Sequence, residues 1–239
     1  MIIASNFKTN HTRKSTRGFL ERLDRFIKDT ASSQKVMVFP PATALDSFLL
    51  DERITVGVQN AYPVEKGSYT GEIALEQIEE FSLKTILVGH SERRHIFGES
   101  QELCAKKYDF FKSKGFEIVY CIGEPKEVRE EGIDAVIAYN FDQLEGIDLS
   151  YEKLIVAYEP VWAIGTGLTA TSEQIEETLG ELRKKIKAPL LYGGSVKVAN
   201  TREILQIKNC DGILVGTASW NIESFSQMIA IADELRLGV

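Results

Sequence analysis

The sequence predicts an α/β protein whose strand–helix units close into a single (β/α)8 barrel. Short apolar runs alternate along the 239 residues with longer stretches whose apolar side chains recur every three to four positions. This alternation predicts a parallel sheet whose strands are joined by helices. Eight such units in a chain of this length fit a closed barrel, and an open doubly wound sheet is the alternative. No Gly-x-Gly-x-x-Gly motif follows the first apolar run, which argues against that alternative.

The expected strands are short and apolar, as befits strands covered on both faces. The second one is stopped by Pro40 and Pro41, because proline cannot donate to a strand ladder. In chain order the eight strands occupy Ile2–Lys8, Lys35–Phe39, Ile54–Gln59, Thr85–Val88, Glu117–Ile122, Leu154–Tyr158, Pro189–Tyr192 and Gly212–Val215.

The expected helices carry their apolar residues on one stripe. The first begins near Ser15, and Phe19, Leu23 and Ile27 recur along it at helical spacing. Thr171 and Gln174 resemble a capping box ahead of a helix whose stripe is Ile175, Leu179, Leu182 and Ile186. Further helices are expected over Ala42–Leu50, Leu75–Phe81, Ser91–Phe97, Ser100–Lys114, Pro125–Leu144, Asn200–Ile207 and Ile222–Leu237.

Composition indicates one globular domain over residues 1–239, with 44% hydrophobic and 26% charged residues. A net charge of −7 disfavours nucleic acid and anionic membranes as partners, and an anionic substrate would need locally placed cations. No apolar run approaches the roughly 18 residues of a membrane span. The three cysteines are far apart, and the N-terminus lacks a signal-peptide pattern, so we expect a cytoplasmic protein. The three histidines lack metal-ligand spacing, and no metal is expected.

The stretch Leu154–Thr171 carries the strongest chemical signal. Glu159 directly follows its buried strand, and an apolar loop then runs from Pro160 to Gly167. Proline fixes the backbone at one end and glycines free it at the other, which is what a closing lid requires. A carboxylate beneath a water-excluding lid can have a raised pKa and act as a general base. The alternative is a solvated strand-end glutamate followed by an ordinary turn.

Three more polar side chains stand at strand ends, and in a barrel these ends meet at one face. Asn6 and Lys8 point the same way from the first strand, because side chains alternate along a strand. They could direct an amide and a cation at a substrate oxygen, or be solvated strand-end groups. His90 ends the fourth strand and precedes a short helix, whose N-terminal amides would favour the neutral imidazole. A purely structural histidine is the alternative.

Two glycine-containing turns complete the set. YGGS (Tyr192–Ser195) and LVGTAS (Leu214–Ser219) follow the seventh and eighth strands, where barrels often bind phosphate. Small residues let backbone amides approach an anion. Both segments can also be read as ordinary tight turns.

These motifs together resemble those of the triosephosphate isomerases. The resemblance spans nearly the whole chain in order, through NFK, GSYTGE, VGHSERR, CIGE, AYEPVWAIGTG, YGGSV and LVGTAS. It implies a cofactor-free, metal-free isomerase that interconverts dihydroxyacetone phosphate and D-glyceraldehyde 3-phosphate, in glycolysis and gluconeogenesis. By the same resemblance Glu159 is the base, His90 the neutral electrophile and Lys8 the electrostatic stabiliser.

Other roles follow from the resemblance alone. Asn6 helps to orient the site, and Ser91 and Glu92 adjoin the histidine. The substrate phosphate is held by backbone amides of Gly165, Ser195, Gly216 and Thr217. Thr217 departs from the family, in which a second glycine is usual, and Leu168 replaces the usual lysine at the second hinge of the lid. If position 217 needed a positive φ, a threonine there would be strained.

The long loop Asn60–Gly71 resembles the family's interdigitating loop, which docks beside the active site of a second subunit. The resemblance therefore implies a homodimer in which Thr70 reaches Asn6 and Lys8 of the partner. Cys121 matches a family cysteine, and we interpret it as a buried packing thiol. Two other functions stay open at this point. One is a different phosphate-binding barrel isomerase, and the other is a catalytically silent protein that binds phosphate compounds.

Overall fold

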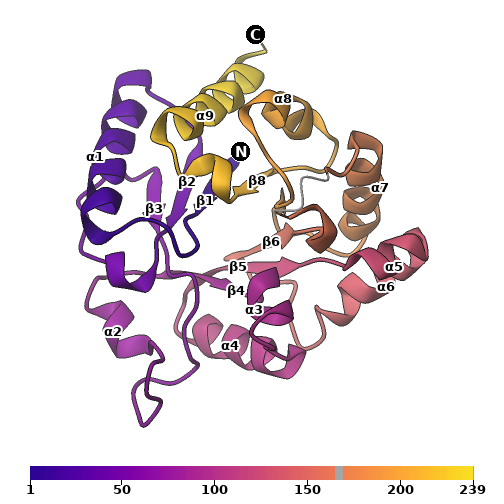
Figure 1. Ribbon diagram of the computed structural model, residues 1–239, viewed down its shortest axis with the longest axis horizontal. Coiled ribbons are helices and arrows are strands. Elements are labelled where there is room, and N and C mark those ends of the chain that lie inside the picture. The colour runs from indigo at the N-terminus through magenta and orange to yellow at the C-terminus, as the bar shows by residue number, and fades with distance from the viewer. Residues whose placement is uncertain (165–168, 239) are drawn as a thin grey trace.

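The computed structural model describes residues 1–164 and 169–238, in which eight parallel strands form one barrel-shaped sheet (Figure 1). Hydrogen bonds join these strands in the order β3-β2-β1-β8-β7-β6-β5-β4, and a parallel bridge between Val58 and Ile86 closes the ring. The predicted (β/α)8 barrel is confirmed. The strands are β1 (Ile2–Asn6), β2 (Lys35–Phe39), β3 (Ile54–Val56), β4 (Thr85–Val88), β5 (Glu117–Ile122), β6 (Leu154–Tyr158), β7 (Leu190–Tyr192) and β8 (Gly212–Val215).

Helices surround the strands, most of them as an outer ring (Figure 1). They are α1 (Arg13–Thr30), α2 (Leu75–Glu79), α3 (Ser91–His95), α4 (Gln101–Ser113), α5 (Lys126–Glu130), α6 (Ile133–Asp142), α7 (Ser172–Arg183), α8 (Val198–Gln206) and α9 (Ile222–Leu237). The short α3 is the exception to the ring, since it lies inward of α4 near the ends of the strands (Figure 1). Short 3-10 turns lie after three strands, namely η1 (Ala42–Ala44), η2 (Val161–Ala163) and η3 (Thr217–Ser219). Within the described ranges, no helix combines the length and apolar character needed to span a membrane.

Alternation along the strands divides the core into two layers. One layer fills the barrel and consists of Ile2, Ala4, Met37, Phe39, Leu87, Val119, Cys121, Ile155, Ala157, Leu191 and Leu214. The other layer packs strand residues such as Ile3 and Val36 against the helices. Because side chains alternate with period two, Asn6 follows Ala4 inward and Glu159 follows Ala157 inward. The apolar pattern of the strands therefore directs both polar residues into the mouth of the barrel.

The expected helix over Ala42–Leu50 is wrong, because only η1 forms there and Leu45–Leu50 lacks regular structure. Leu45, Phe48 and Leu50 still pack against the main core, while the side chain of Leu49 between them is fully exposed. The carboxylate of Asp46 instead accepts hydrogen bonds from Arg13 and Arg17 at the start of α1.

The expected helix over Pro125–Leu144 is divided into α5 and α6. Gly132 lies between them with a φ of 102°, a conformation that an α-helix cannot contain. The first strand is shorter than expected because Lys8 takes a φ of 51° and turns the chain away. At α7 the predicted capping box is confirmed, with the Thr171 side chain and Gln174 bonded to each other's backbone amides.

Candidate active site

The segment after β1 makes a strained turn that places Lys8 at the barrel mouth. Lys8 has a φ of 51°, which costs a non-glycine residue about 1–2 kcal/mol. The side chain of Asn6 stabilises this bend, because its Oδ1 accepts the N–H of Lys8 at 2.9 Å. Gln59 adds two bonds from its Nε2, to Asn6 Oδ1 at 3.2 Å and to the Lys8 carbonyl at 2.9 Å. Asn6 thus stabilises the turn at Lys8 through its side chain.

His90 follows β4 and begins α3. Gly89 turns the chain with a φ of 75°, and His90 is then the N-cap of the helix. The backbone N–H of Glu92 donates to Nδ1 of the imidazole at 3.3 Å. An Nδ1 that accepts a hydrogen bond carries no proton, so this geometry fits the neutral tautomer protonated at Nε2. That Nε2 lies 3.2 Å from Oε1 of Glu159.

Glu159 is packed tightly at the end of β6, with only 3% of its surface exposed. Its Oε2 accepts the backbone N–H of Ser91 at 3.2 Å. Two glycines make room for it. A Cβ at Gly193 would lie 2.7 Å from Glu159 Cγ, and one at Gly123 would lie 1.8 Å from the Glu159 carbonyl oxygen. The residue types on the neighbouring strands therefore fix where the carboxylate can sit.

The two buried groups shift each other's pKa. Burial raises the pKa of Glu159, but the facing His90 and the Ser91 N–H lower it by more, so the pKa is lowered, not raised as expected, and the carboxylate stays ionised. Burial lowers the pKa of His90, but the carboxylates of Glu159 and Glu92 raise it by more. The expected contact between a helix N-terminal amide and the imidazole is present, since the Glu92 N–H donates to Nδ1, and it favours the neutral ring. The two carboxylates favour the charged ring instead. A deprotonated carboxylate beside an imidazole N–H is an arrangement suited to moving protons.

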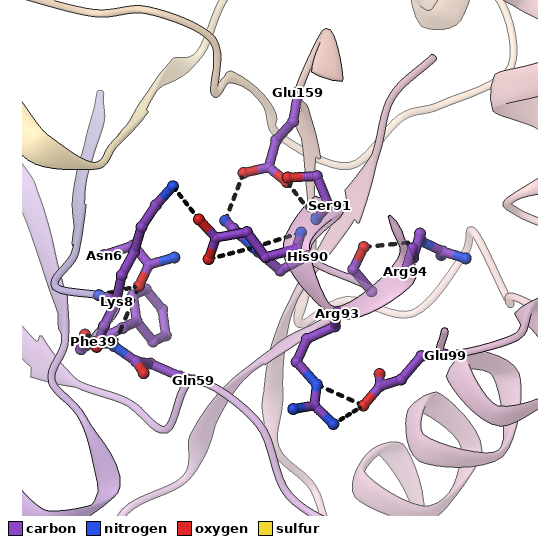
Figure 2. A network of polar contacts seen from close by, with 12 residues as sticks. Asn6, Lys8, Phe39, Gln59, His90, Ser91, Arg93, Arg94, Glu99 and Glu159 are labelled. Atoms are coloured by element: carbon purple, nitrogen blue, oxygen red, sulfur yellow. Dashed lines mark hydrogen bonds and ion pairs between the residues drawn. The ribbon is translucent and has the colours of Figure 1, made fainter. Parts of the chain in front are cut away.

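Lys8 reaches the same pair from the opposite side of the mouth. Its Nζ lies 2.6 Å from Oε1 of Glu92, and its side chain is 18% exposed. Figure 2 shows Glu159 and His90 pointing toward each other, with Lys8 approaching from the β1 side. The carboxylate of Glu92 thus pairs with the ammonium, while its backbone N–H holds the histidine.

These side chains share one cavity of about 430 Å³ at the barrel mouth. Its size suits a small ligand, since pockets for drug-sized ligands are about 300–1,000 Å³. The cavity brings together predicted residues from five strand ends, which are Asn6, Lys8, His90, Glu159, Ser195, Gly216 and Thr217. Ser91 and Glu92 do not line it and support His90 and Lys8 from behind.

The glycine turns form one end of the cavity. Within the described ranges, the N–H groups of Ser195 and Thr217 donate to no protein acceptor, so both are free for an anion. Thr217 begins η3 and is absent from the residues with positive φ, so the anticipated strain at this position does not arise. Gly165, the fourth predicted phosphate residue, lies outside the described residues.

The loop after Glu159 is anchored at its start. Val161–Ala163 form η2, and the Trp162 indole donates to Oε1 of buried Glu124 at 2.9 Å. The Ser195 hydroxyl donates to the carbonyl of Ala163 at 2.6 Å. The second half of the predicted lid, including Leu168, lies outside the described residues.

Sequence reasoning missed other parts of the cavity wall. Lys197 lines it together with Ile164, Val196 and Ala218. Lys197 could have been predicted, because it directly follows YGGSV and a protein with a net charge of −7 needs local cations to bind an anionic substrate. Arg93, in contrast, points away from the cavity. Its guanidinium pairs with Glu99, which also binds the buried ammonium of Lys107.

The loop predicted to reach a second subunit extends from the barrel between β3 and α2 (Figure 1). Thr70, the last residue but one of this loop, is exposed and does not line the cavity of its own chain. The rings of Tyr62 and Tyr69 pack against each other across the loop, with centroids 4.5 Å apart and planes tilted by 36°. Among residues 1–164 and 169–238, no cluster of His, Cys, Asp and Glu has the arrangement of a metal site.

One family profile and several curated relatives match nearly the whole of this chain. The family profile described as triosephosphate isomerase matches residues 1–232. A triosephosphate isomerase from a Nitratiruptor species is 55% identical over 236 residues, covering 99% of this chain and 100% of the relative. Proteins of the same name from Wolinella succinogenes and a Sulfurovum species are 56% and 57% identical, each over 96% of this chain and 99% of the relative.

Proposed function

Because this chain belongs to the triosephosphate isomerase family and is an isomerase, we propose that it interconverts dihydroxyacetone phosphate and D-glyceraldehyde 3-phosphate through an enediolate. The whole of residues 1–239 forms the catalytic domain in this proposal. The observation that carries it is the contact of 3.2 Å between Glu159 Oε1 and His90 Nε2 at the wall of a cavity that Lys8 also lines.

Glu159 acts as the base in the proposed mechanism. It takes a proton from the carbon beside the substrate carbonyl and returns it to the neighbouring carbon. The lowered pKa of its carboxylate supports this role, because a base must be deprotonated when the substrate arrives. Its burial in the barrel mouth keeps water away from the reacting carbons.

His90 and Lys8 stabilise the enediolate oxygens. The Nε2 of His90 faces Glu159 Oε1 at 3.2 Å, and a bound substrate oxygen would take over as the acceptor of its proton. The ammonium of Lys8 adds a positive charge at the same place. Donors aimed at developing negative charge in a buried site are often the largest part of catalysis. Asn6 contributes by holding the Lys8 turn.

Turnover of the purified protein tests this proposal directly. D-Glyceraldehyde 3-phosphate should be consumed in an assay coupled to the reduction of dihydroxyacetone phosphate. If the protein binds 2-phosphoglycolate but turns over neither triose phosphate, it is a silent binding protein and the proposed mechanism fails.

The substrate phosphate lies against Ser195, Gly216 and Thr217 in this proposal, with Gly165 as a further donor. Its test uses the backbone amide of Thr217. Thr217→Pro removes that N–H, together with the threonine side chain, at the first position of a helical turn, where proline fits. Affinity for 2-phosphoglycolate should fall about 10- to 100-fold, since a hydrogen bond to a charged group is worth about 1.5–3 kcal/mol.

Thr217→Ala is the matched control, because it removes the side chain and keeps the amide. Its affinity, measured by titration calorimetry, should stay within about twofold of the native value. Equal affinities in the proline and alanine variants would show that this amide does not bind the phosphate.

The functional unit in this proposal is a cytoplasmic homodimer. Three buried, unpaired thiols support a reducing compartment. Exposed Ile96, Phe97 and Tyr69 offer apolar surface for the second subunit. A groove of about 170 Å³ lies beside Gln59, which holds the Lys8 turn, so Thr70 of a partner loop inserted there would approach Asn6 and Lys8.

The mass in solution tests the dimer. Sedimentation should give about 54 kDa, twice the 26.8 kDa of one chain. Tyr69→Asp should shift the mass toward the single chain and lower activity with it, because a charge would be buried at the contact. Leu237→Asp, at an exposed apolar residue of α9, should do neither. A native mass near that of one chain would disprove the dimer.

A further inference from the structure

The segment that carries Lys8 is fastened to the residue that follows η3. The indole Nε1 of Trp220 donates to the carbonyl oxygen of Asn6 at 3.0 Å. The Nε2 of His11 lies 3.1 Å from the carbonyl oxygen of Trp220, and it is the donor because a carbonyl only accepts. The His11 ring also stacks on Phe7, with centroids 4.2 Å apart and planes at 26°. We call these three contacts the His11–Trp220 clasp.

The clasp encloses two backbone positions that L-residues disfavour. Lys8 has a φ of 51° and His11 a φ of 69°. Such conformations persist only where surrounding contacts determine them. The clasp fixes the carbonyl of Asn6 on one side of Lys8 and the ring of His11 on the other. The left-handed bend at Lys8 is therefore held between two fastened points.

The other end of the clasp adjoins the turn at residues 216–219, which we call the phosphate turn because the proposed function has it bind the substrate phosphate. Trp220 comes directly after η3, whose first residue is Thr217. The Ser219 hydroxyl bonds to that of Ser5 on β1 at 2.6 Å and to the Gly216 carbonyl at 2.7 Å. Gly216 lies close beneath the lysine, since a Cβ there would be 3.2 Å from Lys8 Cε. The clasp thus joins the lysine turn and the phosphate turn across β1 and β8.

We propose that His11 and Trp220 are positioning residues that set the place of the Lys8 ammonium relative to the phosphate turn. This inference rests on the proposed function, because it assigns the pair to the same substrate site. Neither residue lines the cavity, so neither touches the substrate. Their effect reaches the substrate through Lys8.

A double-mutant cycle tests this effect. Trp220→Phe removes the bond to Asn6 and keeps an aromatic ring. Affinity for 2-phosphoglycolate, measured by titration calorimetry, should fall about tenfold in the native background, because small misplacements of a binding group are costly. In a Lys8→Met background the same substitution should change affinity less than twofold. A merely structural role would instead give equal losses in both backgrounds.

His11→Gly is the second variant, since glycine adopts a φ of 69° freely and loses only the ring contacts. It should reproduce the loss seen in Trp220→Phe, and the two losses should not add. Ser82→Gly is the matched control at another non-glycine residue with a positive φ, 58°, which lies exposed on the turn that leads into β4. It should leave affinity and kcat/KM unchanged.

Equal losses in the native and Lys8→Met backgrounds overturn the inference, and so does native affinity in Trp220→Phe. Failure of the proposed function has a different signature. It appears in the native protein as absent turnover, whereas the cycle is read from binding of 2-phosphoglycolate and does not require turnover.

Discussion

Replacing Glu159 with glutamine is expected to lower kcat roughly 10³- to 10⁴-fold, near the upper range of what one general base contributes. Glutamine keeps the shape of the side chain and can still accept the Ser91 N–H. It cannot take a proton from carbon. Affinity for 2-phosphoglycolate should therefore stay within a few-fold of the native value, and the loss should lie in kcat.

The geometry also predicts a small structural cost for this variant. The carboxylate accepts on both oxygens, from Ser91 N–H and from His90 Nε2. A glutamine amide must turn its NH2 group toward one of these two donors. His90 cannot readily change tautomer to compensate, because the Glu92 N–H occupies its Nδ1. We expect a measurable drop in the melting temperature without loss of the fold.

Glu117→Gln is the matched control for the Glu159 variant. It makes the same chemical change at the beginning of β5, where Glu117 pairs with Lys35 far from the cavity. Its kcat should equal that of the native protein. Retention of more than about a tenth of native kcat in Glu159→Gln, on the scale of a general-base contribution, would remove Glu159 from the role of base.

Lys8→Met carries the second large expected effect. It removes the ammonium that lines the cavity and leaves the Glu92 carboxylate without its partner at 2.6 Å. We expect kcat/KM to fall roughly 10³-fold or more, because removal of one oxyanion donor alone costs about 10²–10³ in kcat. Affinity for 2-phosphoglycolate should fall as well, since the ligand loses a cation and meets an unpaired negative charge.

The double variant Lys8→Met/Glu92→Gln separates these two causes. If the unpaired carboxylate repels the ligand, the second substitution should restore part of the lost affinity and little of the lost kcat. Lys14→Met, at an exposed position on α1, should leave both quantities at the native level. Unchanged binding of 2-phosphoglycolate in Lys8→Met would disprove the placement of Lys8 beside the substrate.

Much of this site was predictable because strand patterns are local. Alternation along β1 and β6 predicts that Asn6 and Glu159 point into the barrel, and parallel strands end at one face. The short helix after His90 was visible in VGHSERR, and His90 is its N-cap. The sequence around Lys8 predicted neither its positive φ nor its ion pair with Glu92, which is 84 residues away.

The errors also have physical causes. A helix over Ala42–Leu50 does not form although Leu45, Phe48 and Leu50 pack on one core, because the segment is held by tertiary contacts such as those of Asp46 with Arg13 and Arg17. Gly132 could have been recognised as a helix end, since glycine so often ends helices, but only its φ of 102° decides the break. The roles of His11 and Trp220 were invisible because 209 positions separate the two residues.

The sequence by itself determined the α/β alternation, the barrel and the identity of the residues at the strand ends. These features depend on periodicity and on short motifs, which act over a few residues of the chain. Only the tertiary structure decided which of those residues meet. The contact of Glu159 with His90, the pairing of Lys8 with Glu92 and the clasp of His11 with Trp220 all form between distant segments. Closure of the barrel creates them, because it brings the ends of β1, β4, β6 and β8 to one mouth.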